Sequence, residues 1–511
     1  MGQRVNGLER AELARATIAE LFERNAEWFL VSDNAEAQAI NRSELDVYIA
    51  HSRLVLACWT EQGTRTWKIF SWECTGEKLV LEASRRLSAD RPIIELVPRA
   101  SAKSIALTVK TARHERCKAL AELVGSYQPR AKIERIALSP GARRGQPGKY
   151  ARIVLRLPHQ RIAVTGSVAA SRPGDVDAFL TSALLWFKRV SERSRAPYVQ
   201  SLHLLAEKPL LAPLLHRVAF LRSALRDSIT VFEIDQRLRK LTLVPTPLPE
   251  ELWKRRLRRF PPTNPAEFSS VATRIQSIAP DAIDIVSARH GETLRYRGLP
   301  FARVRSVMKV EKVWFGLEAK QRPLLDEDTE RAFQELVIDL EEHRRAGAID
   351  HHHALYRNAA EAWLESLLRR DITKLDPGLI IAPLHAQFRT SRTGTVSVRP
   401  IDLLALRHDG RLAVIELKAS EDREHVLQAV DYWQRVEAHR RRGHVQRARL
   451  FGERRIKNEP PLIYLVAPTL RVHVSFNTLA RSISPDIEIY RFDINEDWRS
   501  AVRVMRRLRV N

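Results

Sequence analysis

Hydrophobic residues recur along the chain at spacings that predict alternating helices and strands. Residues 10–30 carry apolar side chains at helical spacing, namely Leu13, Ile18, Leu21 and Phe22, which predicts a helix. Residues 45–82 predict a strand meander with a turn at Gln62-Gly63. Further strands are expected at 104–109, 150–157, 229–234, 241–244, 282–287 and 293–297, and further helices at about 111–125, 174–191, 209–226 and 327–346.

From residue 355 onward, strands and helices are expected to alternate. The expected helices cover about 355–370, 421–442, 473–483 and the C-terminus, and the expected strands cover 379–388, 399–407, 411–419, 462–467 and 487–492. Such alternation implies an α/β layer architecture. A chain of this length suits about three domains at roughly 150 residues each. With a break near 126–129, we expect an N-terminal α+β domain of unassigned role over 1–128, a middle α+β region over 129–348 that could recognise a substrate, and an α/β domain over 349–511.

Composition narrows the class of protein. The 511 residues include 85 Lys and Arg against 61 Asp and Glu, a formal net charge of +24 at pH 7. Hydrophobic residues make up 44% of the chain and charged residues 29%, which excludes wholesale disorder. Three cysteines are too few for a disulfide framework, and no apolar run approaches the ~18 residues of a membrane span. We therefore expect a cytoplasmic protein with no membrane partner, and its charge favours a polyanionic partner only if a suitable site accompanies it.

Two basic segments are candidates for contact with phosphate groups. The loop 140–149 contains Arg143, Arg144 and Lys149 but lacks the glycine spacing and the Ser or Thr of a P-loop. In residues 253–260, Trp253, Leu257 and Phe260 fall on one face of a predicted helix, so the basic residues share the other face; these are Lys254, Arg255, Arg256, Arg258 and Arg259. A basic surface hairpin and a solvated helix face are the simpler interpretations, and a phosphate-backbone footprint is the alternative.

The hairpin predicted at 399–419 carries charged residues where apolar ones would be expected. In the strand 412–419, side chains alternate between faces, and apolar residues on both faces are typical of a strand that is covered on both sides. Glu416 and Lys418 share one face near its end, and Asp402 lies in the partner strand. Buried charges of this kind are costly unless they are paired. The simpler interpretation is a frayed strand end where Glu416 and Lys418 reach water.

Residues on the flanking helices favour a site over a frayed end. Gln428 and Tyr432 lie one turn apart on the following predicted helix, and Glu361 borders the apolar face of the preceding one. Glu365 sits further round that helix, toward the expected solvent side. Carboxylates from separate elements near one strand end suit a hard divalent cation that retains water molecules. Such an ion beside a lysine is suited to activating water against a phosphodiester.

The length of the hairpin loop decides whether one cation can be shared. A two-residue loop at Asp409-Gly410, the usual form for this dipeptide, would pair Asp402 with Leu417 and separate the carboxylates. A three-residue loop over 408–410 pairs Asp402 with Glu416 instead. We therefore predict the three-residue loop, with a G1 bulge and positive φ at Gly410.

These residues together resemble a known family. Asp402, the Glu416-Leu417-Lys418 motif, an upstream helical Glu361 and the downstream Gln428 and Tyr432 look like the PD-(D/E)XK nuclease superfamily. The closest likeness is to its RecB-type branch and to the archaeal mismatch and flap endonucleases with such a C-terminal domain. The resemblance covers about residues 350–511, and the family's Pro-Asp reads Pro400-Ile401-Asp402 here. It implies a restriction-endonuclease-like domain, with a mixed central sheet flanked by helices, preceded by α+β domains.

The resemblance also implies roles for individual residues. Asp402 and Glu416 would hold Mg²⁺ (or Mn²⁺) with the Leu417 carbonyl, and Lys418 would activate water and stabilise developing charge. Glu361 would be the helical acid, with Glu365 as an alternate. Gln428 and Tyr432 would position the strand or the nucleic-acid backbone. The implied activity is metal-dependent endonuclease hydrolysis of phosphodiester bonds, with DNA as the expected substrate.

Two other functions compete with a nuclease. A non-catalytic nucleic-acid-binding protein could keep the same fold as a platform, but the intact Asp, Glu and Lys set favours catalysis. A metal site built on His351, His352, His353 and His385 is disfavoured because consecutive histidines cannot all face one ion. The choice between DNA and RNA, the substrate's strandedness, and a monomer or homodimer are left open.

Overall fold

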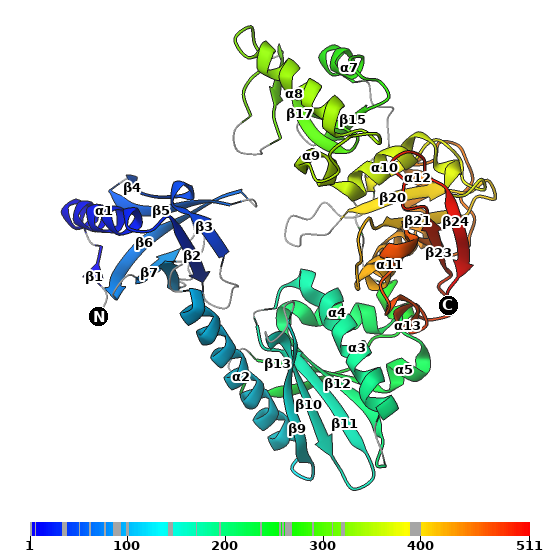
Figure 1. Cartoon of the computed structure of the whole chain (residues 1–511). Helices are drawn as coiled ribbons and strands as arrows, with labels where there is room; N and C mark the ends of the chain where they lie inside the picture. Colours follow the sequence, from blue (N-terminus) through cyan, green and yellow to red (C-terminus); the bar gives the residue numbers. More distant parts are fainter. Residues whose placement is uncertain are drawn as a thin grey trace. The chain divides into compact units, whose positions relative to one another are not determined.

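The computed structural model describes most of the chain. The residues outside the description are 1–2, 6, 33–37, 51, 61–62, 76–77, 85–92, 99–101, 142–146, 170, 194–195, 236–237, 255–256, 258–259, 261–267, 289–290, 309, 318–321 and 389–399. The chain divides into two compact units, one formed by residues 1–155 and 165–171 and the other by 156–164 and 172–511. The elements mix helices with several sheets, so the fold is α/β in the broad sense that the sequence predicts (Figure 1).

The first unit is built on an antiparallel sheet with strand order β3-β2-β8-β7-β6-β5-β4, and β1 pairs with β6. Its strands are β1 (Gln3–Arg4), β2 (Glu27–Ser32), β3 (Gln38–Asn41), β4 (Leu45–Ala50), β5 (Arg53–Thr60), β6 (Gly63–Thr75), β7 (Lys78–Ser84) and β8 (Ile93–Pro98). Helix α1 (Leu8–Glu23) packs on the sheet through Ala11, Ala14, Ile18, Leu21 and Phe22. The helix predicted over 10–30 is therefore too long, because Trp28 belongs to β2 and meets the Phe22 ring edge-on at 5.5 Å. Leu13 is 65% exposed and lies outside the core.

Helix α2 (Ala102–Tyr127) covers both the strand predicted at 104–109 and the helix predicted at about 111–125. The strand predicted at 104–109 is wrong, since this stretch forms the beginning of α2. Its β-branched residues favour a strand locally, but such propensity is weak against the continuation of a long helix.

A second sheet has the order β14-β13-β12-β11-β10-β9. Its strands are β9 (Lys132–Pro140), β10 (Pro147–Arg156), β11 (Arg161–Ser167), β12 (Val199–Glu207), β13 (Ile229–Ile234) and β14 (Leu241–Val244), and its helices are α3 (Val176–Arg193), α4 (Lys208–Val218), α5 (Ser223–Asp227) and α6 (Pro249–Leu252). The single helix predicted over 209–226 is interrupted after Val218. There Leu221 forms a β-bridge with Ile483, and the Arg222 N–H donates to the Ser482 carbonyl at 2.9 Å.

A four-stranded antiparallel meander follows, with order β15-β16-β17-β18. Its strands are β15 (Ile283–Ala288), β16 (Gly291–Tyr296), β17 (Leu299–Val307) and β18 (Val310–Phe315), flanked by α7 (Ser270–Gln276) and α8 (Glu330–His343). Phe301, Phe315 and Phe333 pack together in its core. The predicted strands at 282–287 and 293–297 and the helix near 327–346 are confirmed within a few residues.

The C-terminal sheet has the order β19-β20-β21-β22-β23-β24. Its strands are β19 (His385–Phe388), β20 (Ile401–Leu406), β21 (Leu412–Leu417), β22 (Leu462–Pro468), β23 (Ile489–Ile494) and β24 (Val504–Arg509), and its helices are α9 (Ala354–Arg357), α10 (Ala360–Arg370), α11 (His425–Arg441), α12 (His444–Arg447) and α13 (Phe476–Ala480). The β21–β22 and β22–β23 pairs are parallel and the others antiparallel. Every residue of β21 is buried, as expected for a central strand.

Helices cover both faces of this sheet (Figure 1). Trp363 and Leu364 of α10 pack with Ile415 on one face, whereas Tyr432 and Val436 of α11 pack with Val414 on the other. Because adjacent residues of β21 point to opposite faces, both sets of contacts reach the strand that carries Glu416.

Three predicted elements near the C-terminus are wrong. The helix at 355–370 is split at Asn358-Ala359, and Ala359 adopts a left-handed conformation with φ 49°. The strand at 379–388 is shortened to β19, since Pro383 has no N–H to donate to a ladder. The terminal helix is instead the edge strand β24, which pairs with β23.

Arg344 explains why the helix splits. Its side chain is fully buried (0% exposed) after α8 and donates to backbone carbonyls on both sides of the break. These bonds include 2.6 Å to Leu355, 2.7 Å to Asn358 and 3.3 Å to Ala359, and further bonds reach Tyr296 and Arg297 of the meander. The guanidinium thus fixes the start of α10 against the meander. No described helix is long and apolar enough to span a membrane.

Candidate active site

The β20–β21 hairpin has the register that a shared site requires. Leu403 pairs with Ile415 and Leu406 with Leu412, and the Arg407 N–H donates to the Arg411 carbonyl at 2.9 Å. The Gly410 N–H donates to the Arg407 carbonyl at 2.9 Å, which closes a turn whose last residue, Gly410, has φ 84°. The predicted three-residue loop with positive φ at Gly410 is confirmed.

The ladder ends at Leu403 and Ile415, and continuing it by one residue would put Asp402 opposite Glu416 on the same face. The two carboxyl groups are close enough for Asp402 to raise the pKa of Glu416. Asp402 is half-buried, and its Oδ2 accepts a hydrogen bond from the Leu417 N–H at 2.9 Å. This bond crosses between the strands just beyond the last backbone pair, Leu403 and Ile415. It fixes one carboxylate oxygen beside the Glu416-Leu417-Lys418 segment.

Glu416 is 1% exposed, and one of its carboxylate oxygens has no hydrogen-bond donor among the described residues. Its Oε1 is 3.0 Å from the Lys418 Nζ, but no donor among the described residues reaches Oε2. Burial and the nearby Asp402 carboxylate raise the pKa of Glu416 well above its ordinary value, and Lys418 opposes them. A buried, unsatisfied carboxylate oxygen is costly to the fold unless something binds it.

Lys418 is surrounded by acidic groups. Besides Glu416, its Nζ lies 3.5 Å from the Asp422 carboxylate, a residue that the sequence analysis did not select. Burial alone would lower the pKa of Lys418, but the carboxylates of Glu416 and Glu361 outweigh it and raise the pKa. The ammonium is therefore the charged form in this cluster at neutral pH.

Glu361 and Glu365 occupy different environments on α10. Burial raises the pKa of Glu361, Lys418 opposes the shift and Asp402 adds to it, so Glu361 belongs to the same cluster. Glu365 is only 3% exposed and lies 3.7 Å from Arg295 of β16. The expectation that Glu365 points toward solvent is wrong, because the meander covers that side of α10.

Gln428 and Tyr432 meet on α11 as their spacing predicts. The Gln428 Nε2 donates to the Tyr432 hydroxyl at 2.8 Å, and both side chains are buried. Burial and the Glu416 carboxylate raise the pKa of Tyr432, so its hydroxyl keeps its proton. The Gln428 Oε1 has no partner among the described residues.

His425 also contacts the site, and the sequence analysis did not select it. It begins α11, is buried, and its Nε2 lies 3.3 Å from the Glu416 carbonyl oxygen. Burial and Lys418 lower the pKa of His425 to about 3, so the imidazole is neutral. A lone histidine at the start of a helix carries no sequence signal for this role; for Asp422, the spacing of four residues from Lys418 was the available signal.

The donor set suits a hard cation that needs few protein ligands. Among the described residues, no three His, Cys, Asp or Glu side chains converge as a metal-ligating group. Asp402 and Glu416 lie close together, Leu417 directly follows Glu416 in sequence, and among the described residues no donor reaches the buried Glu416 Oε2. Magnesium in proteins is often bound by one or two carboxylates and retains several waters, so these residues fit Mg²⁺ or Mn²⁺.

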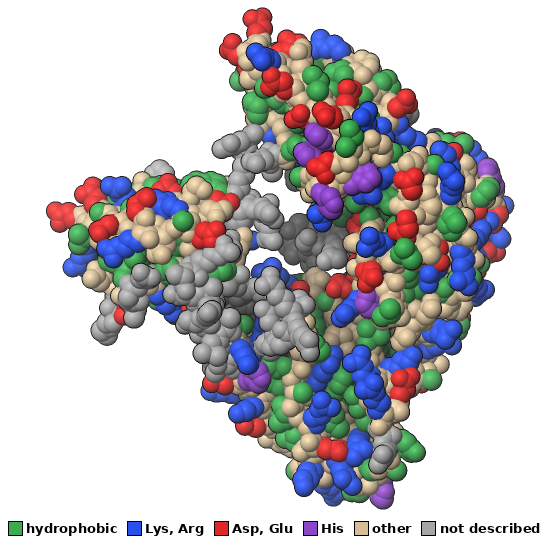
Figure 2. Space-filling model, in the orientation of Figure 1, with side chains coloured by type: hydrophobic (Ala, Val, Ile, Leu, Met, Phe, Trp, Pro, Cys, Tyr) green, Lys and Arg blue, Asp and Glu red, His purple; other side chains and the backbone are tan. Residues whose placement is uncertain are grey.

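The predicted basic segments lie away from this cluster in sequence, and the structure describes them only in part. Arg143, Arg144, Arg255, Arg256, Arg258 and Arg259 lie outside the described residues, whereas Lys149 lies in β10 and Lys254 is exposed. The described residues of the helix predicted over 253–260 are not helical, since α6 ends at Leu252. Trp253 instead packs edge-on against Trp433 of α11, and Phe260 stacks on His439 at 4.1 Å. On the face shown in Figure 2, Lys and Arg side chains are scattered over the C-terminal domain among acidic ones.

The histidines set aside above do not converge. His351 stacks on Tyr356 and His353 on His343, while the His385 Nε2 contacts the Leu450 carbonyl.

Comparison of the chain with protein-family models, with curated proteins and with solved structures found no match in any of the three. The interpretation of the site therefore depends on its own geometry.

Proposed function

We propose that the C-terminal domain is a Mg²⁺-dependent nuclease with a restriction-endonuclease-like fold, and that it hydrolyses phosphodiester bonds in DNA. One observation carries this proposal: the hairpin register directs Asp402 and Glu416 to one face, beside Lys418, and no donor in the described part of the chain reaches the buried Glu416 Oε2. The mixed sheet with helices on both faces, and an acidic residue on α10, support the resemblance to the PD-(D/E)XK superfamily.

Each residue has a role that follows from its surroundings. Asp402, Glu416 and the Leu417 carbonyl would hold the cation, which when bound supplies Lewis acidity and lowers the pKa of coordinated water. Lys418 keeps its proton on Nζ, so it would orient an attacking water and neutralise charge that develops on the phosphate. Glu361 would accept a hydrogen bond from that water, and Gln428 and Tyr432 would hold α11 beside the end of β21.

A cleavage assay with the full-length chain tests this function. Purified protein with Mg²⁺ or Mn²⁺ is incubated with single-stranded, duplex, mismatched and flapped DNA and with RNA. We expect metal-dependent cleavage that Asp402→Asn, Glu416→Gln and Lys418→Met each abolish, with nucleic-acid affinity largely kept. Glu453→Gln is the matched control, because the ion pair of Glu453 within the described structure is with Arg449, and both side chains are exposed.

The assay also separates the competing functions. Cleavage by Glu416→Gln at the wild-type rate would show that the catalytic assignment is wrong. Nucleic-acid binding without metal-dependent cleavage by the wild-type chain would favour the non-catalytic binding protein instead.

A further inference from the structure

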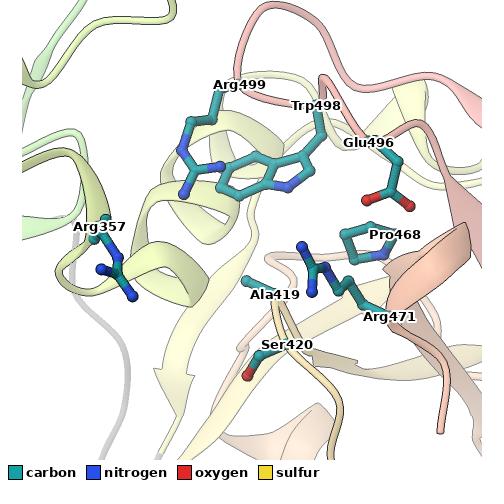
Figure 3. A pocket seen from close by; sticks show the side chains of 8 residues that line it. All are labelled: Arg357, Ala419, Ser420, Pro468, Arg471, Glu496, Trp498 and Arg499. Atoms are coloured by element: carbon teal, nitrogen blue, oxygen red, sulfur yellow. The ribbon is translucent and has the colours of Figure 1, made fainter. Parts of the chain in front are cut away.

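A pocket of about 300 Å³ has Ala419 and Ser420, the residues that follow Lys418, in its wall (Figure 3). It is lined by Arg357, Ala419, Ser420, Pro468, Arg471, Glu496, Trp498 and Arg499. The volume is at the lower end of the range for ligand pockets, roughly 300 to 1,000 Å³. Three of the eight lining side chains are arginines, so the pocket is suited to an anion.

The three arginines form no ion pair within the described part of the chain, although the charge of Asp497 acts on Arg499. None of the guanidinium groups of Arg357, Arg471 and Arg499 forms an ion pair or donates a hydrogen bond to any described group. The Nε of Arg499 is also buried without an acceptor. Figure 3 shows Arg471 and Arg499 extending into the pocket from different walls, with Arg357 on the α9 side. Their donors therefore remain available to a ligand.

The Arg499 guanidinium is held in place by aromatic rings. It lies 4.3 Å from the ring centre of Trp498, 4.6 Å from that of Tyr356 and 5.2 Å from that of Trp363. Cation–π contacts of this kind fix the side chain without using its N–H donors. A pre-positioned guanidinium loses less entropy when it binds an oxyanion.

One acidic side chain lines the same pocket. The Glu496 Oε1 accepts a hydrogen bond from the Leu470 N–H at 2.7 Å, which ties this carboxylate to the backbone. With three cations and one anion, the lining remains positive. The pocket therefore still favours an anion although Glu496 lines it.

The chain connects this pocket directly to the candidate active site. Ala419 and Ser420 are the two residues after Lys418, so the pocket wall begins within ~7 Å of it along the backbone. Arg357 ends α9, just before the helix that carries Glu361. Phosphates of one strand recur every ~3.4 Å along a duplex axis. A strand with one phosphate at Lys418 could thus place another in the pocket.

We propose that this pocket binds a phosphate group of the nucleic-acid substrate, one or a few nucleotides from the bond that is cut. The site of cleavage rests on the nuclease function proposed above, whereas the pocket's affinity for phosphate does not. Arginine guanidinium groups match phosphate oxygens through charge-assisted, bidentate hydrogen bonds. The phosphate is either an internal phosphodiester or the phosphomonoester at a strand end.

The test measures binding without catalysis. Full-length protein in EDTA is titrated against internally labelled single-stranded DNA, and anisotropy gives Kd over a range of salt concentrations. The main variant is Arg357→Gln/Arg471→Gln, because both side chains are exposed. The control is Arg454→Gln/Arg481→Gln, which removes the same charge from two exposed arginines outside this pocket. Arg499→Gln serves as a further variant. Circular dichroism then checks that the variant stays folded without the contacts between Arg499 and the aromatic rings.

We expect the Arg357→Gln/Arg471→Gln variant to bind about tenfold more weakly than the control variant, as expected when charge-assisted phosphate bonds are lost. Its salt slope should fall by roughly 0.7 for each lost contact on a single strand. Equal affinities and slopes for the two double variants would overturn the proposal. If the affinity falls while wild-type protein never cleaves, the pocket stands and the nuclease function fails.

Three substrates identify the source of the phosphate. Linear DNA with a terminal phosphate, the same strand with hydroxyl ends, and a circular strand of equal length are compared. An affinity loss confined to the phosphorylated linear strand assigns the pocket to a terminal phosphate. An equal loss on all three assigns it to an internal phosphodiester.

Discussion

The Asp402 Oδ2 accepts a hydrogen bond from the Leu417 N–H at 2.9 Å, across the hairpin. Asp402 therefore lies within reach of the backbone between Glu416 and Lys418. The bond holds the Asp402 carboxylate beside the segment that carries Glu416. Strands β20 and β21 and this hydrogen bond thus position the two carboxylates at the centre of the site.

The two glutamates one turn apart on α10 should have separable effects. Glu361→Gln should lower cleavage about a hundredfold with little change in stability, because its carboxylate lies in the Lys418 cluster. Glu365→Gln should lower the free energy of unfolding by roughly 2 kcal/mol, since it leaves Arg295 without its buried partner. Cleavage rates and urea denaturation of both variants check this. The same loss of activity in both would contradict the assignment of Glu361.

Metal binding should stabilise the chain more strongly as pH rises. The pKa of Glu416 is raised by burial and by Asp402, so at low pH the group is protonated and a cation must displace that proton. Deprotonation removes this competition. The rise in Tm caused by Mn²⁺ should thus be larger at about pH 8 than at about pH 5.5.

Glu416→Gln serves as the control for this prediction. It lacks the titrating carboxylate, so the difference between the two pH values should largely disappear. A metal-induced shift of equal size in this variant would show that the cation binds elsewhere.

Gly410→Ala should destabilise the hairpin. A Cβ here would lie 2.7 Å from the Arg455 carbonyl oxygen, and φ is 84°, so steric overlap adds to backbone strain. We expect a loss of about 2 to 3 kcal/mol in the free energy of unfolding. Gly452→Ala is the control, because its φ is 64° but nothing lies within 4 Å of a Cβ. Its cost should be about 1 kcal/mol, and equal costs would contradict the close approach at Gly410.

Arg344→Met should destabilise the second unit and lower cleavage. It removes a fully buried guanidinium and leaves carbonyls of the α9–α10 junction, such as Asn358, without donors. We expect a loss of about 3 kcal/mol or more. Activity should fall as well, because Glu361 follows this junction directly. Exposed Arg345→Met is the neighbouring control, and a loss of equal size in both variants would contradict the role of Arg344.

The hairpin could be predicted because its constraints are local. Loop length, the alternation of side chains and the glycine at the loop end together determine how Asp402 faces Glu416. The relation between Gln428 and Tyr432 was predictable for the same reason, since helical spacing places them one turn apart. Elements of this kind need little information from distant parts of the chain.

Features that depend on distant partners were not predictable. The residues of β24 suggested a helix, but pairing with β23 makes them a strand, and Arg507 lies over the rings of Tyr490 and Phe492. Glu365 was expected in solvent because a helical wheel represents one helix alone and does not show that the β15–β18 meander packs against it. The arginine pocket combines residues from α9 and from the segments at the ends of β21, β22 and β23, so no window of sequence shows it.

Side chains alternate between the two faces of β20 and β21, so a slip of one residue in their pairing would turn the Asp402 side chain to the α10 face of the sheet, away from Glu416. The same sequence closed by a two-residue loop would slip in this way. An inserted loop residue would not, because it lengthens the loop and leaves Arg407 opposite Arg411. The positive φ of Gly410, on which the three-residue loop depends, therefore also keeps the two carboxylates together.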